Sequence, residues 1–238
     1  MKDVQSQPDF RNIPIDKVGI KNLRYPITVR DRRDGFQPTI ASINMFVDLP
    51  HNNKGTHMSR FVELLHLLRP EVSLQKFSAI LENMKQHLKA ASAHLEMTFP
   101  YFIEKEAPVS LSPGLMDYTC SIIGTSDPSG KVDLVSQVVV PISSVCPCSL
   151  EISECGAHNQ RGEVRLSTRF KKFIWMEDMI ELVEASASCD VFSVLKRADE
   201  KYVTETAFAH PKFVEDIVRD VAEKLNADDN ITWFSVSA

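Results

Sequence analysis

Side chains that bind metal ions are concentrated in one stretch of the sequence, SVCPCSLEISECGAHNQRGEV, at positions 144–164. Cys146 and Cys148 are separated only by Pro147, and His158 follows in the same stretch. Thiolate and imidazole groups together suit Zn²⁺ or another borderline divalent ion. Cys146 follows one predicted strand and His158 precedes the next, so a hairpin can bring both to one end. Because two protein ligands are too few for a closed structural site, the pair indicates a catalytic site with room for water.

A purely structural explanation also fits these residues. Cys146 and Cys148 can be small buried side chains and His158 a hydrogen-bonded loop residue, because CPC is not a usual zinc spacing. Glu200 and Glu215 can complete a metal site or hold the N–H groups of a ligand. Most carboxylates of this kind are instead solvated.

Three basic residues, Lys54, His57 and Arg60, lie just before and inside the predicted start of a helix, where phosphate groups are readily bound. A solvated helix start explains them equally well. The sequence contains no P-loop, no G-x-S-x-G and no G-x-G-x-x-G, so the common nucleotide-binding and hydrolase signatures are absent.

The first half of the chain alternates between strand and helix patterns. Strands are predicted at 23–29 and 39–49, joined by a hairpin at Asp34-Gly35. One helical face then ends at Pro70, and Ser73 is the predicted N-cap of a second helix. Two further strands are predicted at 93–99 and 118–122. The apolar positions of the two helices are Phe61, Leu64, Leu65, Leu68, Phe77, Ile80, Leu81, Met84 and Leu88.

The second half repeats this order after the turn GTSDPSGK at 124–131. Strands are predicted at 132–142 and 164–170, and a helix at 176–183. Another helix is predicted with Pro211 at position N1, which puts Glu215 in its second turn. A strand at 231–236 follows. The chain is therefore predicted to be α+β, with strand-strand-helix-helix-strand-strand written twice and the second copy lacking its last strand.

Composition indicates a folded protein of one large domain or two small ones. The 238 residues are 43% hydrophobic and 25% charged, and the net charge of −5 gives no general attraction for nucleic acid. Residues 1–18 are polar and are predicted to form a flexible arm. The N-terminus has no signal-peptide pattern and no long apolar run spans a membrane. Five cysteines without an export signal favour reduced thiols and a cytoplasmic location.

The sequence resembles the type IB GTP cyclohydrolases from about residue 15 to the C-terminus. The resemblance rests on CPCSLEISECGAHNQRGEV, on GTHMSRFVELL upstream and on HPKFVEDIVRDV downstream. Members of this family are metal-dependent hydrolases that open the imidazole ring of GTP, release formate and yield 7,8-dihydroneopterin triphosphate. The resemblance therefore implies a first step towards folate, other pterins or queuosine.

The resemblance also implies a fold and an assembly. The fold would be the tunnelling fold, or T-fold, with a first ββααββ unit at 19–128 and a second at 129–238. Such units form a homotetramer with active sites at the subunit interfaces. GTP would be the substrate, and neither nucleic acid nor a membrane would be a partner.

Individual residues match the motifs of the family. Cys146 and His158 match its metal ligands, and Glu200 matches a carboxylate ligand found in some metal-bound forms. The metal would be Zn²⁺, Mn²⁺ or iron. Glu215 matches the acid that anchors guanine, and Cys148 the second cysteine of the motif.

Two roles are assigned less directly. Cys148 and His158 are candidates for the proton transfers of ring opening. The triphosphate needs cations, for which Lys54, His57 and Arg60 are the local candidates.

Two other functions remain open at this point. The Cys/His group could hold a structural metal, or sense redox state, in a non-enzymatic scaffold. A related tunnelling-fold enzyme could act on another purine or pterin. Family members also continue past the strand equivalent to ITWFSV, so the second unit is expected to end in an open sheet edge.

Overall fold

The structure of the protein is a computed structural model that describes residues 5, 7–33, 35–68, 71–72 and 74–238. Its contacts divide the chain into two compact units. The first comprises Met1–Phe99 with Ser121–Val135, and the second Pro100–Cys120 with Ser136–Ala238. Strands β4 (Ala93–Glu106), β5 (Pro113–Ser126) and β6 (Val132–Val145) therefore contribute residues to both units, and residues 132–135 of β6 belong to the first.

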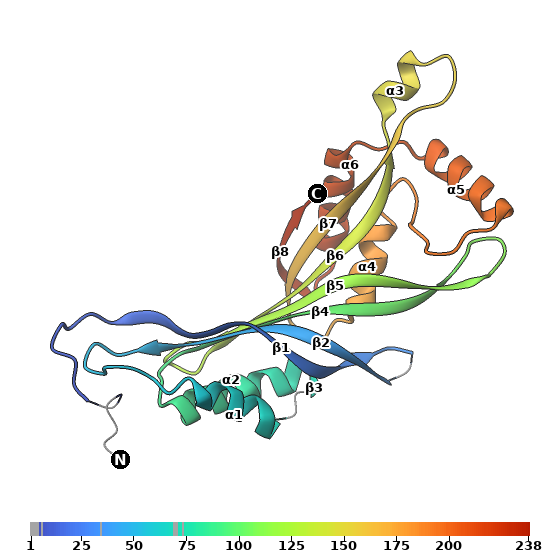
Figure 1. Ribbon diagram of the computed structural model, residues 1–238. Helices are drawn as coiled ribbons and strands as arrows, with labels where there is room; N and C mark the ends of the chain where they lie inside the picture. Colours follow the sequence, from blue (N-terminus) through green and yellow to red (C-terminus); the bar gives the residue numbers. More distant parts are fainter. Residues whose placement is uncertain (1–4, 6, 34, 69–70, 73) are drawn as a thin grey trace. The chain divides into compact units, whose positions relative to one another are not determined.

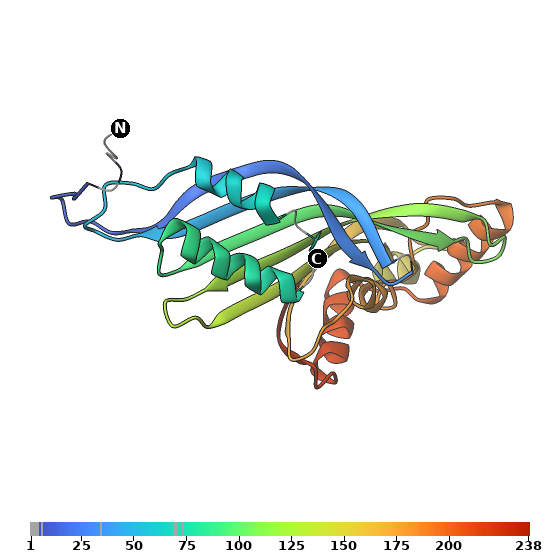
Figure 2. The same cartoon turned by 90° about the horizontal axis from the view of Figure 1, so that it is seen from below.

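The first unit is a sheet covered by two helices. Strand β1 (Ile15–Asp31) pairs with β2 (Gly35–Leu49), and β2 pairs with β4, both antiparallel. The short β3 (Glu71–Val72) runs parallel to β1. Helices α1 (Ser59–Leu68) and α2 (Leu74–Leu88) lie on one face of these strands (Figure 2). From Ala41 onward every second residue of β2 is buried, because one face of the strand meets the helices: Ala41, Ile43, Met45, Val47 and Leu49.

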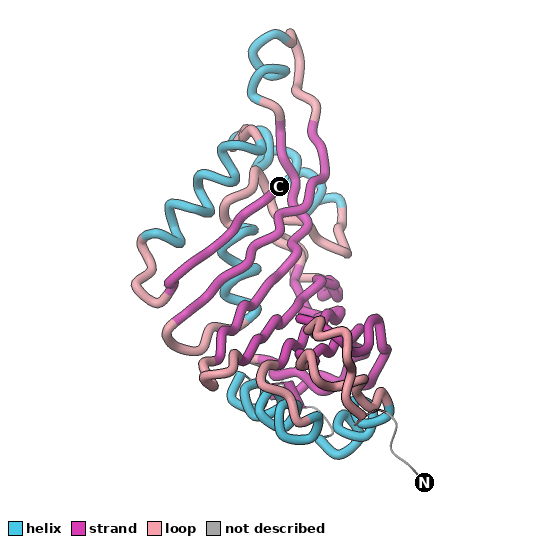
Figure 3. Tube along the Cα trace, turned by 90° about the vertical axis from the view of Figure 1, so that its left-hand side faces the viewer, coloured by secondary structure: helices cyan, strands magenta, loops and turns pink. Residues whose placement is uncertain are grey.

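The second unit carries most of the candidate site residues. Strand β6 (Val132–Val145) pairs antiparallel with β7 (Asn159–Phe170), which pairs antiparallel with β8 (Ile231–Ser237). The short helix α3 (Pro147–Ile152) lies at the end of the β6–β7 hairpin (Figures 1 and 3). Three further helices follow β7: α4 (Met176–Glu184), α5 (Arg197–Ala209) and α6 (Val214–Asn226). The buried residues of α4 and α6 include Met179, Ile180, Val183, Ile217, Val221 and Leu225.

Two buried tyrosine–glutamate pairs attach α4 to the long strands within the second unit. Tyr101 of β4 donates a hydrogen bond of 2.7 Å to Glu177, and Tyr118 of β5 donates one of the same length to Glu184. Lys105 lies 2.9 Å from Glu184, so the second glutamate has a charged partner as well. Burial nevertheless raises the pKa of Glu184 above its usual value.

Most predicted elements are present. The predicted α+β class is confirmed, and the strands and helices predicted in the first half agree with β1, β2, α1, α2, β4 and β5. In the second half, β6, β7, α4, α6 and β8 also correspond to predicted elements. Helix α5 was not predicted. The division into T-fold units at 19–128 and 129–238 stays a prediction.

Two local expectations need correction or qualification. Pro211 does not occupy position N1, because α6 begins at Val214 with Phe213 as its N-cap. The carboxylate of Asp216 accepts a hydrogen bond of 3.0 Å from the Phe213 N–H, and this contact sets the start of the helix. Glu215 is therefore in the first turn, not the second. Strand β1 begins at Ile15, within the predicted N-terminal arm.

Some predicted features fall on residues that the structure does not describe. The predicted turn residue Asp34, the helix-ending Pro70, the N-cap Ser73 and residues 1–4 and 6 of the arm lie outside the described residues. None of the helices in the described part of the chain is long and apolar enough to cross a membrane.

Candidate active site

Cys146 and His158 face each other across the end of the β6–β7 hairpin. The two strands stay in register up to the pair Val145 and Asn159. One residue further, the N–H of Cys146 donates a hydrogen bond of 3.1 Å to the carbonyl of His158. Cys146 and His158 are therefore the first pair of residues beyond the last strand pair of the hairpin, where its loop begins.

Ser149 stabilises the loop that joins the two candidate ligands. Its hydroxyl donates to the carbonyl of Cys146 at 2.9 Å and accepts from the N–H of His158 at 3.1 Å. Pro147 starts helix α3 directly after Cys146, as suits a first helical position. No sequence motif singled out Ser149, because its role depends on a contact with a residue across the loop.

The environment of Cys146 favours the thiolate. Hydrogen bonds from the backbone N–H of Ser149, and others from Cys148, outweigh burial and hold the pKa of the Cys146 thiol below its usual value. Because the thiolate is the form of cysteine that binds metal, this environment fits a metal ligand. Cys148 and Cys155 are exposed in the same loop.

Helix α5 packs against the end of the β6–β7 hairpin, where the strands meet the loop. Val145 and Ala207 are buried in one small hydrophobic cluster with Cys189, and Ala157 and Val203 pack against it. Val145 precedes Cys146 and Ala157 precedes His158. Glu200 lies one turn before Val203 on α5, so the helix that carries Glu200 contacts the residues next to both other candidates.

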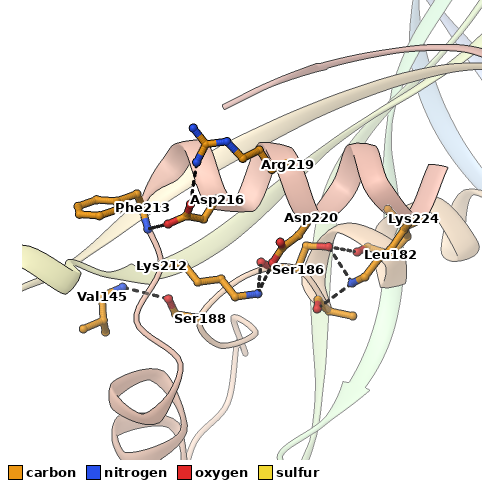
Figure 4. A network of polar contacts seen from close by, with 11 residues as sticks. Val145, Leu182, Ser186, Ser188, Lys212, Phe213, Asp216, Arg219, Asp220 and Lys224 are labelled. Carbon is orange, nitrogen blue, oxygen red and sulfur yellow. Dashed lines mark hydrogen bonds and ion pairs between the residues drawn. The ribbon is translucent and has the colours of Figure 1, made fainter. Parts of the chain in front are cut away.

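Helix α6, which carries Glu215, is tied to the same strand end. The N–H of Lys212 donates to the carbonyl of Val145 at 3.0 Å, and the N–H of Val145 donates to the hydroxyl of Ser188 at 3.2 Å. Figure 4 shows the ammonium group of Lys212 between α6 and the segment after α4. It donates to the carbonyl of Ser186 at 2.9 Å and to Asp220 at 2.7 Å.

The first turn of α6 is also capped and charged. Asp216 accepts from the Phe213 N–H and from Arg219, the latter at 2.9 Å (Figure 4). Glu215 is exposed at the second position of the helix. It is thus accessible to a ligand, and its backbone is fixed by the Lys212 and Asp216 contacts.

The single chain brings the candidate metal ligands together only in part. Cys146 and His158 are neighbours, whereas Glu200 is exposed on α5. Within the described residues, no group of three or more His, Cys, Asp and Glu side chains is arranged to hold a metal ion. The thiol and imidazole of the hairpin fit a borderline divalent ion by their chemistry.

The basic candidates belong to the first unit. His57 and Arg60 line a pocket of about 270 Å³ together with Asp48, Asn53 and Thr56. Lys54 lies in the same loop, and its N–H donates to the carbonyl of Gln7 at 3.0 Å. Arg60 is in the first turn of α1, as predicted.

Comparison with solved structures supports the fold. A uricase from Bacillus fastidious superposes with a TM-score of 0.52, covering 93% of this chain and 84% of that one at 7% sequence identity. A hyper-thermostable AgUricase mutant gives the same TM-score at 9% identity, covering 93% of this chain and 78% of that one. At such low identity the similarity concerns the fold alone.

Comparison of sequences identifies the family. The family model described as type I GTP cyclohydrolase folE2 matches residues 1–238. The GTP cyclohydrolase FolE2 of Desulfosudis oleivorans is 69% identical, over 100% of this chain and 91% of its own length. That of Syntrophobacter fumaroxidans is 58% identical, over 99% of this chain and 92% of its own length. This chain therefore belongs to the type I GTP cyclohydrolase FolE2 family.

Proposed function

We propose that the protein is a metal-dependent GTP cyclohydrolase that opens the imidazole ring of GTP and releases formate to give 7,8-dihydroneopterin triphosphate. The observation that carries this proposal is the pairing of Cys146 with His158 at one hairpin end, in a chain that matches the family over its whole length. The product would enter the synthesis of folate, other pterins or queuosine.

Cys146, His158 and Glu200 are the proposed metal ligands. The lowering of the pKa of the Cys146 thiol by hydrogen bonds and the exposed imidazole of His158 support this assignment for Zn²⁺, Mn²⁺ or iron. When bound, such an ion lowers the pKa of a water molecule and so supplies a nucleophile near neutral pH.

Glu215 is the proposed anchor of the guanine base. A carboxylate accepts hydrogen bonds from both N1–H and the 2-amino group of guanine, and each bond is strengthened by the charge. Adenine has no N–H at N1 and no 2-amino group, so the same carboxylate would discriminate against it. The exposed position of Glu215 in the first turn of α6 supports this role.

Protons and phosphates need further groups. Cys148 and His158, both exposed at the hairpin end, are proposed to transfer protons during ring opening. Lys54, His57 and Arg60 are proposed to bind the triphosphate, and their support is the shared loop and pocket at the start of α1.

The proposed architecture is a homotetramer of tandem T-fold chains, with active sites between subunits. Two features favour association. Strand β8 pairs only with β7 among the described strands, and Phe208, Phe213 and Val214 are exposed where α5 ends and α6 begins. All five cysteines are free thiols, which fits the proposed cytoplasmic location.

The decisive experiment is incubation of metal-loaded protein with GTP, followed by measurement of formate and of a fluorescent oxidised pterin. Protein treated with a chelator and the same assay with ATP are the controls. Chelated protein should keep its circular dichroism spectrum but lose turnover. A protein that releases no formate from GTP, or that unfolds on chelation, would favour a scaffold with a structural metal.

A further inference from the structure

Asp199 is a completely buried carboxylate next to a candidate metal ligand. It is 0% exposed, and it directly precedes Glu200 in the first turn of α5. A buried charge is costly unless hydrogen bonds replace the water that it loses. The hydrogen-bond partners of Asp199 therefore show which segments of the chain this carboxylate connects.

Four hydrogen bonds satisfy the Asp199 carboxylate. One oxygen accepts from the backbone N–H groups of Val109 and Ser110, both at 2.8 Å. The other accepts from the Ser110 hydroxyl at 2.6 Å and from the N–H of Lys196, the N-cap of α5, at 2.8 Å. Asp199 thus joins the first turn of α5 to the turn between β4 and β5.

The other capping acids of the second unit are exposed to solvent to a greater degree. Asp178 and Asp216 occupy the same N3 position in α4 and α6, and each accepts a hydrogen bond from its own N-cap. Asp178 is exposed and Asp216 is half-buried. Asp199 differs because it is fully buried and binds a turn 89 to 90 residues away in the sequence.

Hydrophobic contacts hold the later turns of α5. Val203 and Ala207 pack together with Val145 and Ala157 in the hydrophobic cluster at the end of the hairpin. These contacts fix the later turns of the helix against the residues that precede Cys146 and His158. The first turn, which carries Glu200, is joined to the β4–β5 turn by the hydrogen bonds of Asp199.

We propose that Asp199 is a positioning residue that fixes the backbone of Glu200 relative to Cys146 and His158. This inference rests on the proposed function, in which Glu200 is a metal ligand. The hydrogen bonds from Val109 and Ser110 hold the first turn of α5 at one end, and the Val203 and Ala207 contacts hold the helix further along. Loss of the Asp199 contacts would leave Glu200 on a turn held from one side only.

The test is the metal affinity of Asp199→Asn, measured on metal-free protein by competition for Zn²⁺ with a chromophoric chelator. Outer contacts that orient metal ligands are worth about tenfold to hundredfold in affinity, so the dissociation constant should rise by about that factor. The kcat should fall, whereas the KM for GTP should stay within about twofold, since Glu215 is held by other contacts.

Asp178→Asn is the matched control. It removes the same kind of capping carboxylate from α4, and its zinc affinity should remain that of the wild type. If Asp178→Asn and Asp199→Asn weaken zinc binding equally, the effect is general to helix capping and the proposal is overturned.

A double-mutant cycle with Glu200→Gln separates positioning from general stability. If Asp199 acts through Glu200, Asp199→Asn should weaken zinc binding no further once Glu200 is replaced. Additive losses would overturn the proposal. Should Asp199→Asn fail to fold, Ser110→Ala, which deletes one hydrogen bond to Asp199, replaces it in the same cycle. Its expected effect is about threefold to tenfold.

The outcome for the wild-type protein keeps the two proposals apart. A wild-type protein that binds no zinc and does not convert GTP contradicts the proposed function. A wild-type protein that does both, with Asp199→Asn unchanged in zinc affinity, contradicts only the role of Asp199.

Discussion

The backbone N–H of Lys212 donates a hydrogen bond of 3.0 Å to the carbonyl of Val145. Val145 directly precedes the candidate metal ligand Cys146, and Lys212 stands three positions before the candidate guanine anchor Glu215. One backbone contact therefore links the strand end that precedes the candidate metal ligand to the segment that leads into the helix of the candidate guanine anchor. The same strand end is held on its N–H side by Ser188.

Replacement of Lys212 by methionine should loosen this link. The backbone hydrogen bond would remain, but the carbonyl of Ser186 and the carboxylate of Asp220 would both lose the ammonium group. We expect a loss of about 1–2 kcal/mol in the free energy of unfolding. Because α6 carries Glu215, kcat/KM for GTP should fall by about threefold to tenfold. Denaturant unfolding and steady-state kinetics measure the two effects.

Lys201→Met provides the control for this change. Lys201 is exposed and lies 3.8 Å from Glu205 on the surface of α5. Exposed ion pairs of this kind contribute about 0–1 kcal/mol, so the stability of this variant should be near that of the wild type. Equal losses in the two lysine variants would contradict a specific role for Lys212.

Replacement of Cys146 by alanine should remove both metal and activity. We expect about one divalent ion per subunit in the wild type and less than about a tenth of that in the variant, because the Cys146 thiolate is a proposed metal ligand. The matched control is Cys155→Ala, which removes an exposed thiol from the same loop. Metal analysis of both proteins after dialysis, with the formate assay, gives the answer. Wild-type metal content in Cys146→Ala would refute the ligand assignment.

The elements with strong hydrophobic periodicity could be predicted from the sequence. Alternate residues of β2 and the apolar face of α1 are buried, as their patterns indicated. Helix α5 could not be recognised in this way. Only Asp199 and Ala207 are buried among its residues, so its sequence lacks an apolar stripe. Its first turn is held by hydrogen bonds to a distant turn, and its later turns by a few hydrophobic contacts with the hairpin, and such contacts leave no local pattern.

The candidate site shows the same limit. The pairing of Cys146 with His158 follows from a hairpin between two predicted strands, and it could be expected from the sequence. The roles of Ser149 and Asp199 depend on contacts across a loop or between distant segments. Pro211 led to a wrong helix start, because the Asp216 side chain sets the N-cap at Phe213, so that the helix begins three residues later than predicted, at Val214.

His94 should make the protein less stable as the pH falls. Its Nδ1 is buried and has no hydrogen-bond partner among the described residues. Burial, and then the charge of Lys17, lower the pKa of His94 below its usual value, while Asp48 acts in the opposite direction. The unfolded chain therefore binds a proton at a higher pH than the folded protein does. The contribution of His94 to the free energy of unfolding is therefore largest above the usual histidine pKa. It decreases as the pH falls below that value, because the unfolded chain then binds the proton more readily than the folded protein.

His94→Gln removes this proton-binding group. Between about pH 7 and pH 5, the Tm of the variant should fall by a few degrees less than that of the wild type. His87→Gln makes the same change at an exposed position of α2 and should follow the wild-type curve. Thermal unfolding at a series of pH values decides the matter, and parallel curves for His94→Gln and the wild type would exclude this role.

Glu215→Gln tests which base the protein recognises, separately from metal binding. The substitution preserves the shape of the side chain but removes its charge and places an amide donor where one carboxylate oxygen is proposed to accept a hydrogen bond from guanine. That donor would then meet a donor on guanine. An unpaired donor in a desolvated pocket costs on the order of 1–3 kcal/mol, which corresponds to a loss of roughly tenfold to hundredfold in kcat/KM.

The metal content of Glu215→Gln should stay at the wild-type level, since Glu215 is not a proposed ligand and α6 remains fixed by Lys212 and Asp216. Glu223→Gln is the control, because it makes the same chemical change at an exposed position nearer the other end of α6. Kinetics with GTP and metal analysis of both variants complete the test. If Glu215→Gln converts GTP as fast as the wild type, a residue other than Glu215 must bind the guanine edge. A loss of metal together with activity would instead point to a disturbed site and contradict the separate role of Glu215 in base recognition.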